Sequence, residues 1–326
     1  MRKLMAAAAL CALAALTLLS GCAGSEEAAK ESGIILGFSQ LGSESGWRIG
    51  NSHDIMTAAN RAGVQLMFEN AEQKQENQIK AIRSFIAYQV DVIAFAPIVE
   101  DGWTNVLTEA REAGIPVLCT DRFISEEDTS LIVGFVGSDF YEEGRRAGEF
   151  LITKAGRMGK DRLRIVEITG TLDSTPMRQR AIGFRDAIEG DQRFEIVQSI
   201  SGDFLKSKGK ECMQRILEEQ GRSIDVVYSH NDAMTLGAIE AIQAEGLTPG
   251  QDIVIITVDG EQGAIDLLKQ GKINCVVECT PKIGDIIMSL AKRLAAGESV
   301  ERYTYSSETV FTEFDENLQD IPARGY

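Results

Sequence analysis

The stretch IILGFSQLGSESGWRIG, residues 34–50, decides the fold class because its character changes twice within a few positions. An unbroken apolar run passes into a turn rich in Gly and Ser, and a helical pattern begins at about Trp47 and continues to about Ala62. A buried strand followed at once by a helix is the opening of a βαβ unit. Gly and Ser are typical turn residues. A tryptophan in such a turn is costly to leave in water, so other atoms are expected to bury its ring.

The same alternation continues along the chain. Strand-like runs and helical patterns alternate as VQLMFEN, KQENQIKAIRSFIAYQ, DVIAFAP, WTNVLTEAREAG and IPVLCTD, and the order repeats between residues 163 and 232. Short, continuously apolar runs are typical of parallel strands covered on both faces. The sequence therefore predicts an α/β protein of two doubly wound, Rossmann-like lobes with parallel sheets. No Pro/Ser-rich linker separates them, so VGFVGSDF, residues 133–140, is expected to be a strand-like hinge.

The N-terminus has the features of a secretory signal. Arg2 and Lys3 precede an apolar run that ends in LSGC at Cys22. This ending resembles the lipobox of bacterial lipoproteins, which predicts a signal peptide over residues 1–21, a lipid on the thiol of Cys22 and anchoring to the cell membrane. Residues 22–32 are small, polar and charged and are expected to form a flexible tether. The alternative is an ordinary signal peptide that happens to contain a cysteine.

Composition excludes several partners. Lys and Arg total 33 against 49 Asp and Glu, a net charge of −16, and the loss of Arg2 and Lys3 with the signal makes it −18. Such a surface repels nucleic acid and anionic lipid. No spacing resembles a zinc or calcium site, so we expect no metal and no cofactor. Four cysteines are expected to be buried free thiols: Cys119, Cys212, Cys275 and Cys279.

Charged and aromatic residues follow the predicted strands in both halves. In open parallel sheets, ligands bind beyond the carboxyl ends of the strands. Asp and Asn at these positions are also common helix N-caps, but Arg and Trp are not. The predicted ligand-binding residues are Glu44, Trp47, Arg48, Asp121, Arg122, Arg180, Phe204, Asn231, Asp232, Asp259 and Glu278. Contact of His230 with the ligand is left open, and Trp103 is expected to be a packing residue.

This set of side chains suits a neutral ligand with many hydroxyl groups. Carboxylates accept hydrogen bonds, Arg donates in a planar fork, and Asn does both. Trp47 and Phe204 can stack on the apolar faces of a sugar ring, so a sugar is expected to cover Trp47. Five acids against three arginines disfavour an anion. The sequence lacks GxSxG, Walker and GxGxxG motifs, and no enzymatic activity is predicted.

Several spaced motifs resemble one protein family. GFSQLGSESGWR, EQKQENQIKAIRSF, IPVLCTDR, SGDFLKSKGKE, YSHNDAMTLGAI and VDG are similar to the type I periplasmic sugar-binding proteins of bacterial ABC importers, and most of all to those that bind galactofuranose. The resemblance extends from about Ile34 to the C-terminus. It places the ligand-binding residues of the family on Asp121, Arg122, Arg180, Phe204, Asn231 and Asp259. The ribose binders have Gln where this chain has Glu278, and an aromatic pair at Trp47 and Arg48, which argues against ribose.

The resemblance also implies an architecture and a role. Three hinge crossings would divide the chain into an N-terminal lobe, residues 33–138 plus 279–306, and a C-terminal lobe, residues 139–278 plus 307–326. The implied function is an extracytoplasmic, monomeric binding protein that captures galactofuranose or a related monosaccharide and delivers it to the permease and ATPase subunits of an ABC transporter. The alternative is a sugar sensor that signals to a membrane receptor. A lac-repressor-type regulator would need an N-terminal helix-turn-helix, and a lipoprotein signal stands there instead.

Overall fold

The computed structural model describes residues 33–326. The predicted signal peptide, the lipid site at Cys22 and the whole predicted tether lie outside this part. Among the described residues, no helix is long and apolar enough to cross a membrane.

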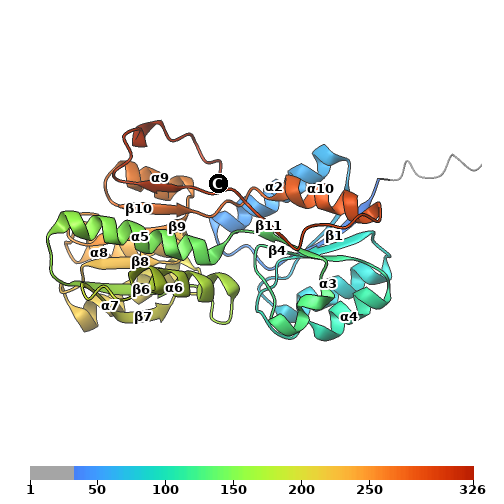
Figure 1. Ribbon diagram of the computed structural model, residues 1–326, viewed down its shortest axis with the longest axis horizontal. Helices are drawn as coiled ribbons and strands as arrows, with labels where there is room; N and C mark the ends of the chain where they lie inside the picture. Colours follow the sequence, from blue (N-terminus) through green and yellow to red (C-terminus); the bar gives the residue numbers. More distant parts are fainter. Residues whose placement is uncertain (1–32) are drawn as a thin grey trace, which may run out of the picture. The chain divides into compact units, whose positions relative to one another are not determined.

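Two six-stranded sheets form the centres of two α/β lobes (Figure 1). The first sheet is parallel throughout, with the order β11-β5-β4-β3-β1-β2. Its strands are β1 (Ile35–Gln40), β2 (Gln65–Asn70), β3 (Val92–Phe95), β4 (Val117–Thr120), β5 (Gly134–Gly137) and β11 (Tyr303–Tyr305). The second sheet has the order β12-β10-β9-β8-β6-β7. Its strands are β6 (Leu163–Thr169), β7 (Phe194–Ser201), β8 (Val226–Ser229), β9 (Val254–Asp259), β10 (Cys275–Glu278) and β12 (Val310–Thr312).

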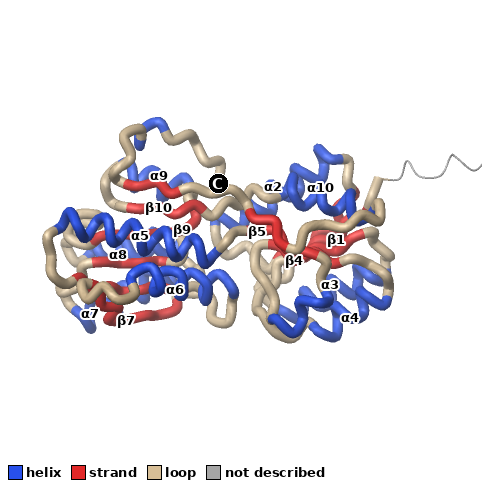
Figure 2. Tube along the Cα trace, in the orientation of Figure 1, coloured by secondary structure: helices blue, strands red, loops and turns tan. Residues whose placement is uncertain are grey.

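Helices cover both faces of each sheet, which explains why the central strands are continuously apolar (Figure 2). In the first lobe, one face packs on α2 (Gly46–Ala62) and α10 (Gly284–Ala295), the other on α3 (Gln75–Ala87) and α4 (Thr104–Glu112). In the second lobe, one face packs on α5 (Phe140–Met158) and α6 (Thr175–Ile188), the other on α7 (Lys206–Gln220), α8 (Asp232–Ala244) and α9 (Gln262–Lys269). Two short 3-10 helices lie at Glu126–Leu131 and Leu318–Asp320.

The predicted doubly wound architecture is confirmed, with one difference. Strand β12 runs antiparallel to β10, so the second sheet is mixed at its edge. A three-residue strand entered from a hinge crossing has no room for the helical connection that a parallel neighbour requires. Trp103 is fully buried and its indole N–H donates to the Val99 carbonyl at 2.9 Å, as a packing residue should. The four cysteines of the described chain are buried and free.

The chain passes between the sheets three times: from β5 to α5, from β10 to α10, and from β11 to β12. One carboxylate joins all three crossings. Glu308 Oε1 accepts hydrogen bonds from the Ser138 hydroxyl, from the Ser306 hydroxyl at 2.9 Å and from the Thr280 amide at 3.0 Å. Ser138 Oγ also lies 3.3 Å from the thiol of Cys279. We propose that the lobes meet at this cluster, with the boundaries that the resemblance implies.

The hinge carboxylate predicts a pH dependence of stability. Burial, and next the charge of Glu143, raise the pKa of Glu308 from about 4.5 to about 8. Between these values the folded protein retains a proton that the unfolded chain releases, so Glu308 stabilises the fold below about pH 4.5 and progressively less up to pH 8. Replacing Glu308 by Gln keeps an acceptor oxygen and removes the titration. We expect the melting temperature to fall less between pH 5 and 8.5 in this variant than in the parent.

The exposed Glu301→Gln exchange is the matched control, since Glu301 makes no side-chain hydrogen bond among the described residues. Equal pH slopes of the melting temperature in the parent and in Glu308→Gln would contradict the assigned role of the hinge carboxylate.

Candidate functional site

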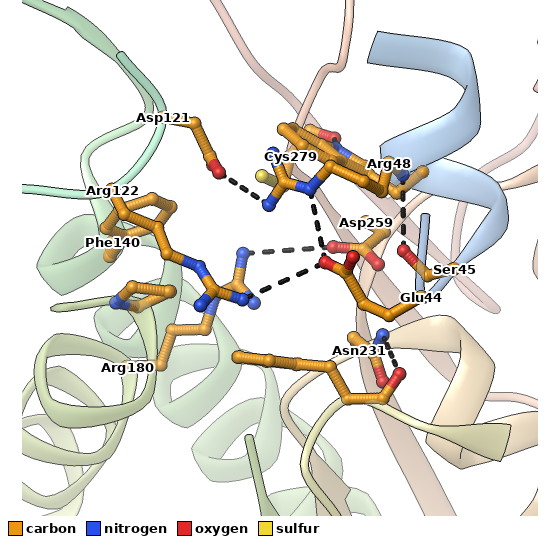
Figure 3. A pocket seen from close by; sticks show the side chains of 13 residues that line it. Glu44, Ser45, Arg48, Asp121, Arg122, Phe140, Arg180, Asn231, Asp259 and Cys279 are labelled. Atoms are coloured by element: carbon orange, nitrogen blue, oxygen red, sulfur yellow. Dashed lines mark hydrogen bonds and ion pairs between the residues drawn. The ribbon is translucent and has the colours of Figure 1, made fainter. Parts of the chain in front are cut away.

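A polar cavity lies between the lobes, at the carboxyl ends of strands from both sheets (Figure 3). It holds about 330 Å³ of space free of protein atoms, including the part open to solvent. Nine of the predicted residues line it: Glu44, Trp47, Arg48, Asp121, Arg122, Arg180, Phe204, Asn231 and Asp259. Four further lining residues were not predicted: Ser45, Phe140, Pro176 and Cys279.

Arg48 organises the wall that the first lobe contributes. It projects from the first turn of α2, its Nε lies 3.1 Å from Glu44 Oε1, and its NH2 lies 2.6 Å from Asp121 Oδ2. A third contact runs from its NH1 to the side-chain oxygen of Gln40, at 3.3 Å. Burial alone would raise the pKa of Glu44, but Arg48 and Arg122 outweigh it and hold the pKa below its usual value. Glu44 is therefore an ionised acceptor at neutral pH.

Arg122 also belongs to the first lobe but is less fully paired. Its NH1 donates to the Ile98 carbonyl at 3.0 Å, and its NH2 lies 3.9 Å from Glu44 Oε1. Burial, and next the charge of Arg48, lower the pKa of Arg122 to about 10, which still leaves it charged at neutral pH. Its Nε and the second oxygen of Glu44 are buried without a hydrogen-bond partner among the described residues. Such unsatisfied buried groups at one cavity point to a polar ligand.

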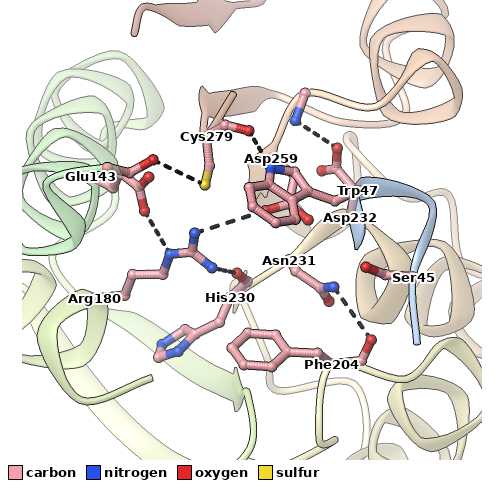
Figure 4. Close-up of polar contacts among 12 residues, drawn as sticks. Ser45, Trp47, Glu143, Arg180, Phe204, His230, Asn231, Asp232, Asp259 and Cys279 are labelled. Atoms are coloured by element: carbon pink, nitrogen blue, oxygen red, sulfur yellow. Dashed lines mark hydrogen bonds and ion pairs between the residues drawn. The ribbon is translucent and has the colours of Figure 1, made fainter. Parts of the chain in front are cut away.

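Arg180 organises the opposite wall, from α6 of the second lobe (Figure 4). Its Nε lies 2.6 Å from Glu143 Oε2, its NH1 donates to the His230 carbonyl at 2.6 Å, and its NH2 lies 3.8 Å from Asp259 Oδ1. Burial raises the pKa of Asp259 well above its usual value although Arg180 acts against it, and the nearby Asp232 adds to the rise. Arg180 and Asp259 therefore present a donor and an acceptor to the cavity side by side.

Three lining residues have backbone angles that L-amino acids rarely adopt. The φ angles are 59° at Asp121, 61° at Phe204 and 123° at Asp259. Asp121 directly follows β4, Asp259 ends β9, and Phe204 lies in the loop after β7. Backbone strain of this kind concentrates at ligand sites. The ring of Phe204 lies against Gly170, where an added Cβ would come within 1.9 Å of it. The guanidinium of Arg122 sits 5.3 Å from the centre of the same ring, so the two lobes meet there.

The prediction that a sugar covers Trp47 needs correction. The side chain is already buried, with 5% of the residue exposed, and packs in the core of the second lobe. Its indole N–H donates to the Cys279 carbonyl at 2.6 Å, and the Arg48 guanidinium lies 4.6 Å from the ring centre. The protein therefore supplies most of the cover, and only the part that borders the cavity is left for a ligand.

Asp232 and Glu278 do not line the cavity. Asp232 is fully buried behind the start of α8, where Oδ1 accepts from the Thr257 hydroxyl at 2.7 Å and Oδ2 from the amides of Gly260 and Glu261 at 2.8 and 2.7 Å. Glu278 pairs with Arg324 and accepts from the Thr309 amide at 3.0 Å. Successive side chains of a strand point to opposite sides. The residue after the strand, Cys279, therefore faces the cavity in place of Glu278.

Two further differences between the predicted and the observed site concern His230 and Phe140. His230 ends up fully buried with Nε2 3.1 Å from Glu167 Oε1, so only its backbone carbonyl serves the site, through Arg180. Phe140 enters the cavity because α5 begins immediately after a hinge crossing. The strand-end rule applied to β5 and β10 would have found Phe140 and Cys279.

The geometry defines what the cavity can bind. Three carboxyl groups and three guanidinium groups line it, so the excess of acids expected from the sequence is absent there. Each arginine lies within 4.0 Å of a carboxylate, which leaves no isolated positive charge to attract an anion. Donors, acceptors and three aromatic side chains (Trp47, Phe140 and Phe204) surround a small space. Such a site recognises a small, neutral, hydroxylated molecule.

Known proteins are similar to this chain in sequence and in fold. The model of the periplasmic binding protein domain matches residues 36–299. The galactofuranose-binding protein YtfQ of Escherichia coli is 40% identical over 281 residues, covering 85% of this chain and 87% of the relative. A Mycobacterium smegmatis protein in complex with β-D-fucofuranose is 44% identical, with a TM-score of 0.84 over 88% of this chain and 93% of that one.

A third relative is the periplasmic binding protein of the arabinose ABC transporter of Shewanella sp. ANA-3, bound to α- and β-L-arabinofuranose. It is 41% identical, with a TM-score of 0.83 and a coverage of 88% of this chain and 93% of that one.

Two α/β lobes with a polar cavity between them define a solute-binding protein of ABC transporters, not an enzyme. The chain belongs to the periplasmic binding protein family, an extracytoplasmic class, and the resemblance seen in its sequence is confirmed.

Proposed function

We propose that this protein captures a neutral monosaccharide in its furanose form, galactofuranose or a close relative, and delivers it to the membrane permease of an ABC importer. The observation that carries the proposal is the charge-balanced cavity, in which Glu44 Oε2 and Arg122 Nε are buried without partners among the described residues. A hydroxyl group can donate to the first and accept from the second.

The relatives support the ring form and the role. Galactofuranose, fucofuranose and arabinofuranose are the sugars named for three proteins that share 40 to 44% of their sequence with this chain. Fucofuranose lacks one hydroxyl of galactofuranose and arabinofuranose is shorter, so we place the common recognition on the five-membered ring. One of the three is a component of an arabinose ABC transporter, which favours transport over the sensory alternative.

Calorimetric titration tests the proposal. Residues 33–326, freed of bound ligand by unfolding and refolding, are titrated with galactose, arabinose, fucose and ribose. We expect saturable binding of at least one of the first three and much weaker binding of ribose. Binding of ribose alone, or of none of the four, would contradict the proposed ligand class.

The proposed location is the outer side of the cell membrane, with the lipid of Cys22 as the anchor. Replacing Cys22 by Ser removes the thiol that would carry the lipid. We expect the full-length variant to leave the membrane fraction while the parent stays in it. Cys11→Ser, a change inside the predicted signal, is the control and should leave the distribution as in the parent. A Cys22→Ser variant that stays in the membrane fraction would overturn lipid anchoring.

A further inference from the structure

A carboxylate of the second lobe binds the first turn of the helix that carries two cavity residues of the first lobe. Helix α2 begins with Gly46, Trp47 and Arg48, and its first turn contains no acidic residue. Ser45 Oγ accepts from the Arg48 amide at 3.2 Å. The Trp47 amide is bound by Glu261 Oε1 at 2.8 Å, from the loop between β9 and α9. The N-terminal capping of α2 is therefore completed from across the cavity.

The position of Glu261 is specified from both sides. On the first lobe, Gly46 leaves room for the carboxylate, since an added Cβ would lie 2.6 Å from Glu261 Oε2. On the second lobe, Asp232 Oδ2 accepts from the amides of Gly260 and Glu261, which fixes the loop. Glu261 stands at the N-cap position of α9 but makes no side-chain capping bond to its own helix. Its carboxylate is thus free to serve α2.

Charge favours the same contact. A carboxylate at the N-terminus of a 17-residue helix is stabilised by the exposed amides and the helix dipole. Burial raises the pKa of Glu261, while the hydrogen bond from Trp47 lowers it. The charge of Glu261 in turn adds to the effect of burial that raises the pKa of Asp232 to about 8. Glu261 does not line the cavity, so it acts on the ligand only through α2.

We propose that Glu261 is a positioning residue that holds the closed form of the protein by capping α2 across the lobes. The closed form is the one in which the lobes lie against each other as in this structure, and the lobes separate from it to admit or release a sugar. The proposal rests on the proposed sugar-binding function. The bond joins residues 214 positions apart in different lobes, so it breaks when the lobes separate. It therefore adds to the barrier that a bound sugar must overcome to leave, and it is absent when a sugar first meets the open protein. Asp232, predicted as a ligand contact, instead orients the loop that carries Glu261.

The test is the dissociation rate of the sugar that binds best, measured by stopped-flow fluorescence. The chain has two tryptophans, and one of them, Trp47, borders the cavity. Loss of an N-terminal cap typically costs about 0.5–2 kcal/mol, so we expect Glu261→Ala to dissociate roughly 2- to 30-fold faster with an association rate close to that of the parent. Glu261→Gln keeps an acceptor oxygen and should recover most of the difference.

Two further variants make the result decisive. Gly46→Ala places a methyl group where the carboxylate lies and should also speed dissociation, although the change is on the other lobe. Glu218→Ala, an exposed acid on α7, should leave both rates unchanged. Equal dissociation rates in the parent and Glu261→Ala would overturn the proposal, as would equal losses in Glu261→Ala and Glu261→Gln. A parent that binds no sugar would instead overturn the proposed function.

Discussion

Replacing Arg122 by alanine should weaken sugar binding strongly. The side chain is buried, it lies between Glu44 and the ring of Phe204, and its Nε has no partner among the described residues. The exchange removes the guanidinium donors of Arg122. It leaves Glu44 paired only with Arg48, in a site from which the bound ligand excludes water. Truncating one partner of a buried charged pair typically costs about 2–5 kcal/mol, or roughly 30- to several-thousand-fold in affinity.

Calorimetric titration with the best sugar measures this loss. Arg111→Ala removes an exposed arginine of the same lobe, on α4, and should bind as the parent does. Trp47→Ala should cost less than Arg122→Ala, because it strands no charge and the protein itself covers most of the ring. An Arg122→Ala variant that binds as tightly as the parent would show that the ligand lies elsewhere.

Replacing Arg180 by methionine should destabilise the protein even without a ligand. The guanidinium is 2.6 Å from Glu143 and 3.8 Å from Asp259, and all three side chains are buried. Removing one partner of a buried ion pair typically costs about 3–5 kcal/mol, because a carboxylate is left without compensation. The free energy of unfolding in urea measures the effect.

The loss in Arg180→Met should also depend on pH. Burial already raises the pKa of both Glu143 and Asp259 against the pull of Arg180. Without Arg180 these carboxyls hold their protons to still higher pH. A raised pKa in the folded state means stability that is present at low pH and lost as the pH rises, so the variant should lose more at pH 8 than at pH 5.5.

The matched control is Arg162→Met. Arg162 pairs with Glu195 at 2.8 Å, but both side chains are well exposed. Exposed ion pairs contribute only about 0–1 kcal/mol, so this exchange should leave stability almost unchanged. Equal losses of stability in Arg180→Met and Arg162→Met would contradict the claim that the buried ion pair of Arg180 stabilises the fold more than the exposed pair of Arg162 does.

The pattern of strands and helices could be predicted because the strands of a parallel sheet covered on both faces are continuously apolar. Central strands such as β4 and β8 are short apolar runs that end in a polar residue. The antiparallel β12 could not be predicted in this way, because it is an edge strand of three half-buried residues that pairs only with β10.

The site could be predicted as far as strand ends determine it. Nine predicted residues meet at one cavity because the carboxyl ends of both sheets face each other. The direction of each side chain could not be predicted. Asp232 turns inward because three donors converge on its carboxylate, and Glu278 turns outward to Arg324, a residue of the C-terminal segment. Contacts between segments so distant in the chain leave no local signal in one sequence.

The ring form of the bound sugar tests the account most directly. Galactose, arabinose and fucose, each labelled with ¹³C at C1, are mixed with the protein, and the C1 resonance of the bound sugar is recorded by NMR. The account predicts that at least one of the three binds and that the bound signal has the chemical shift of a furanose, although pyranoses dominate in free solution. A bound pyranose signal would contradict the account.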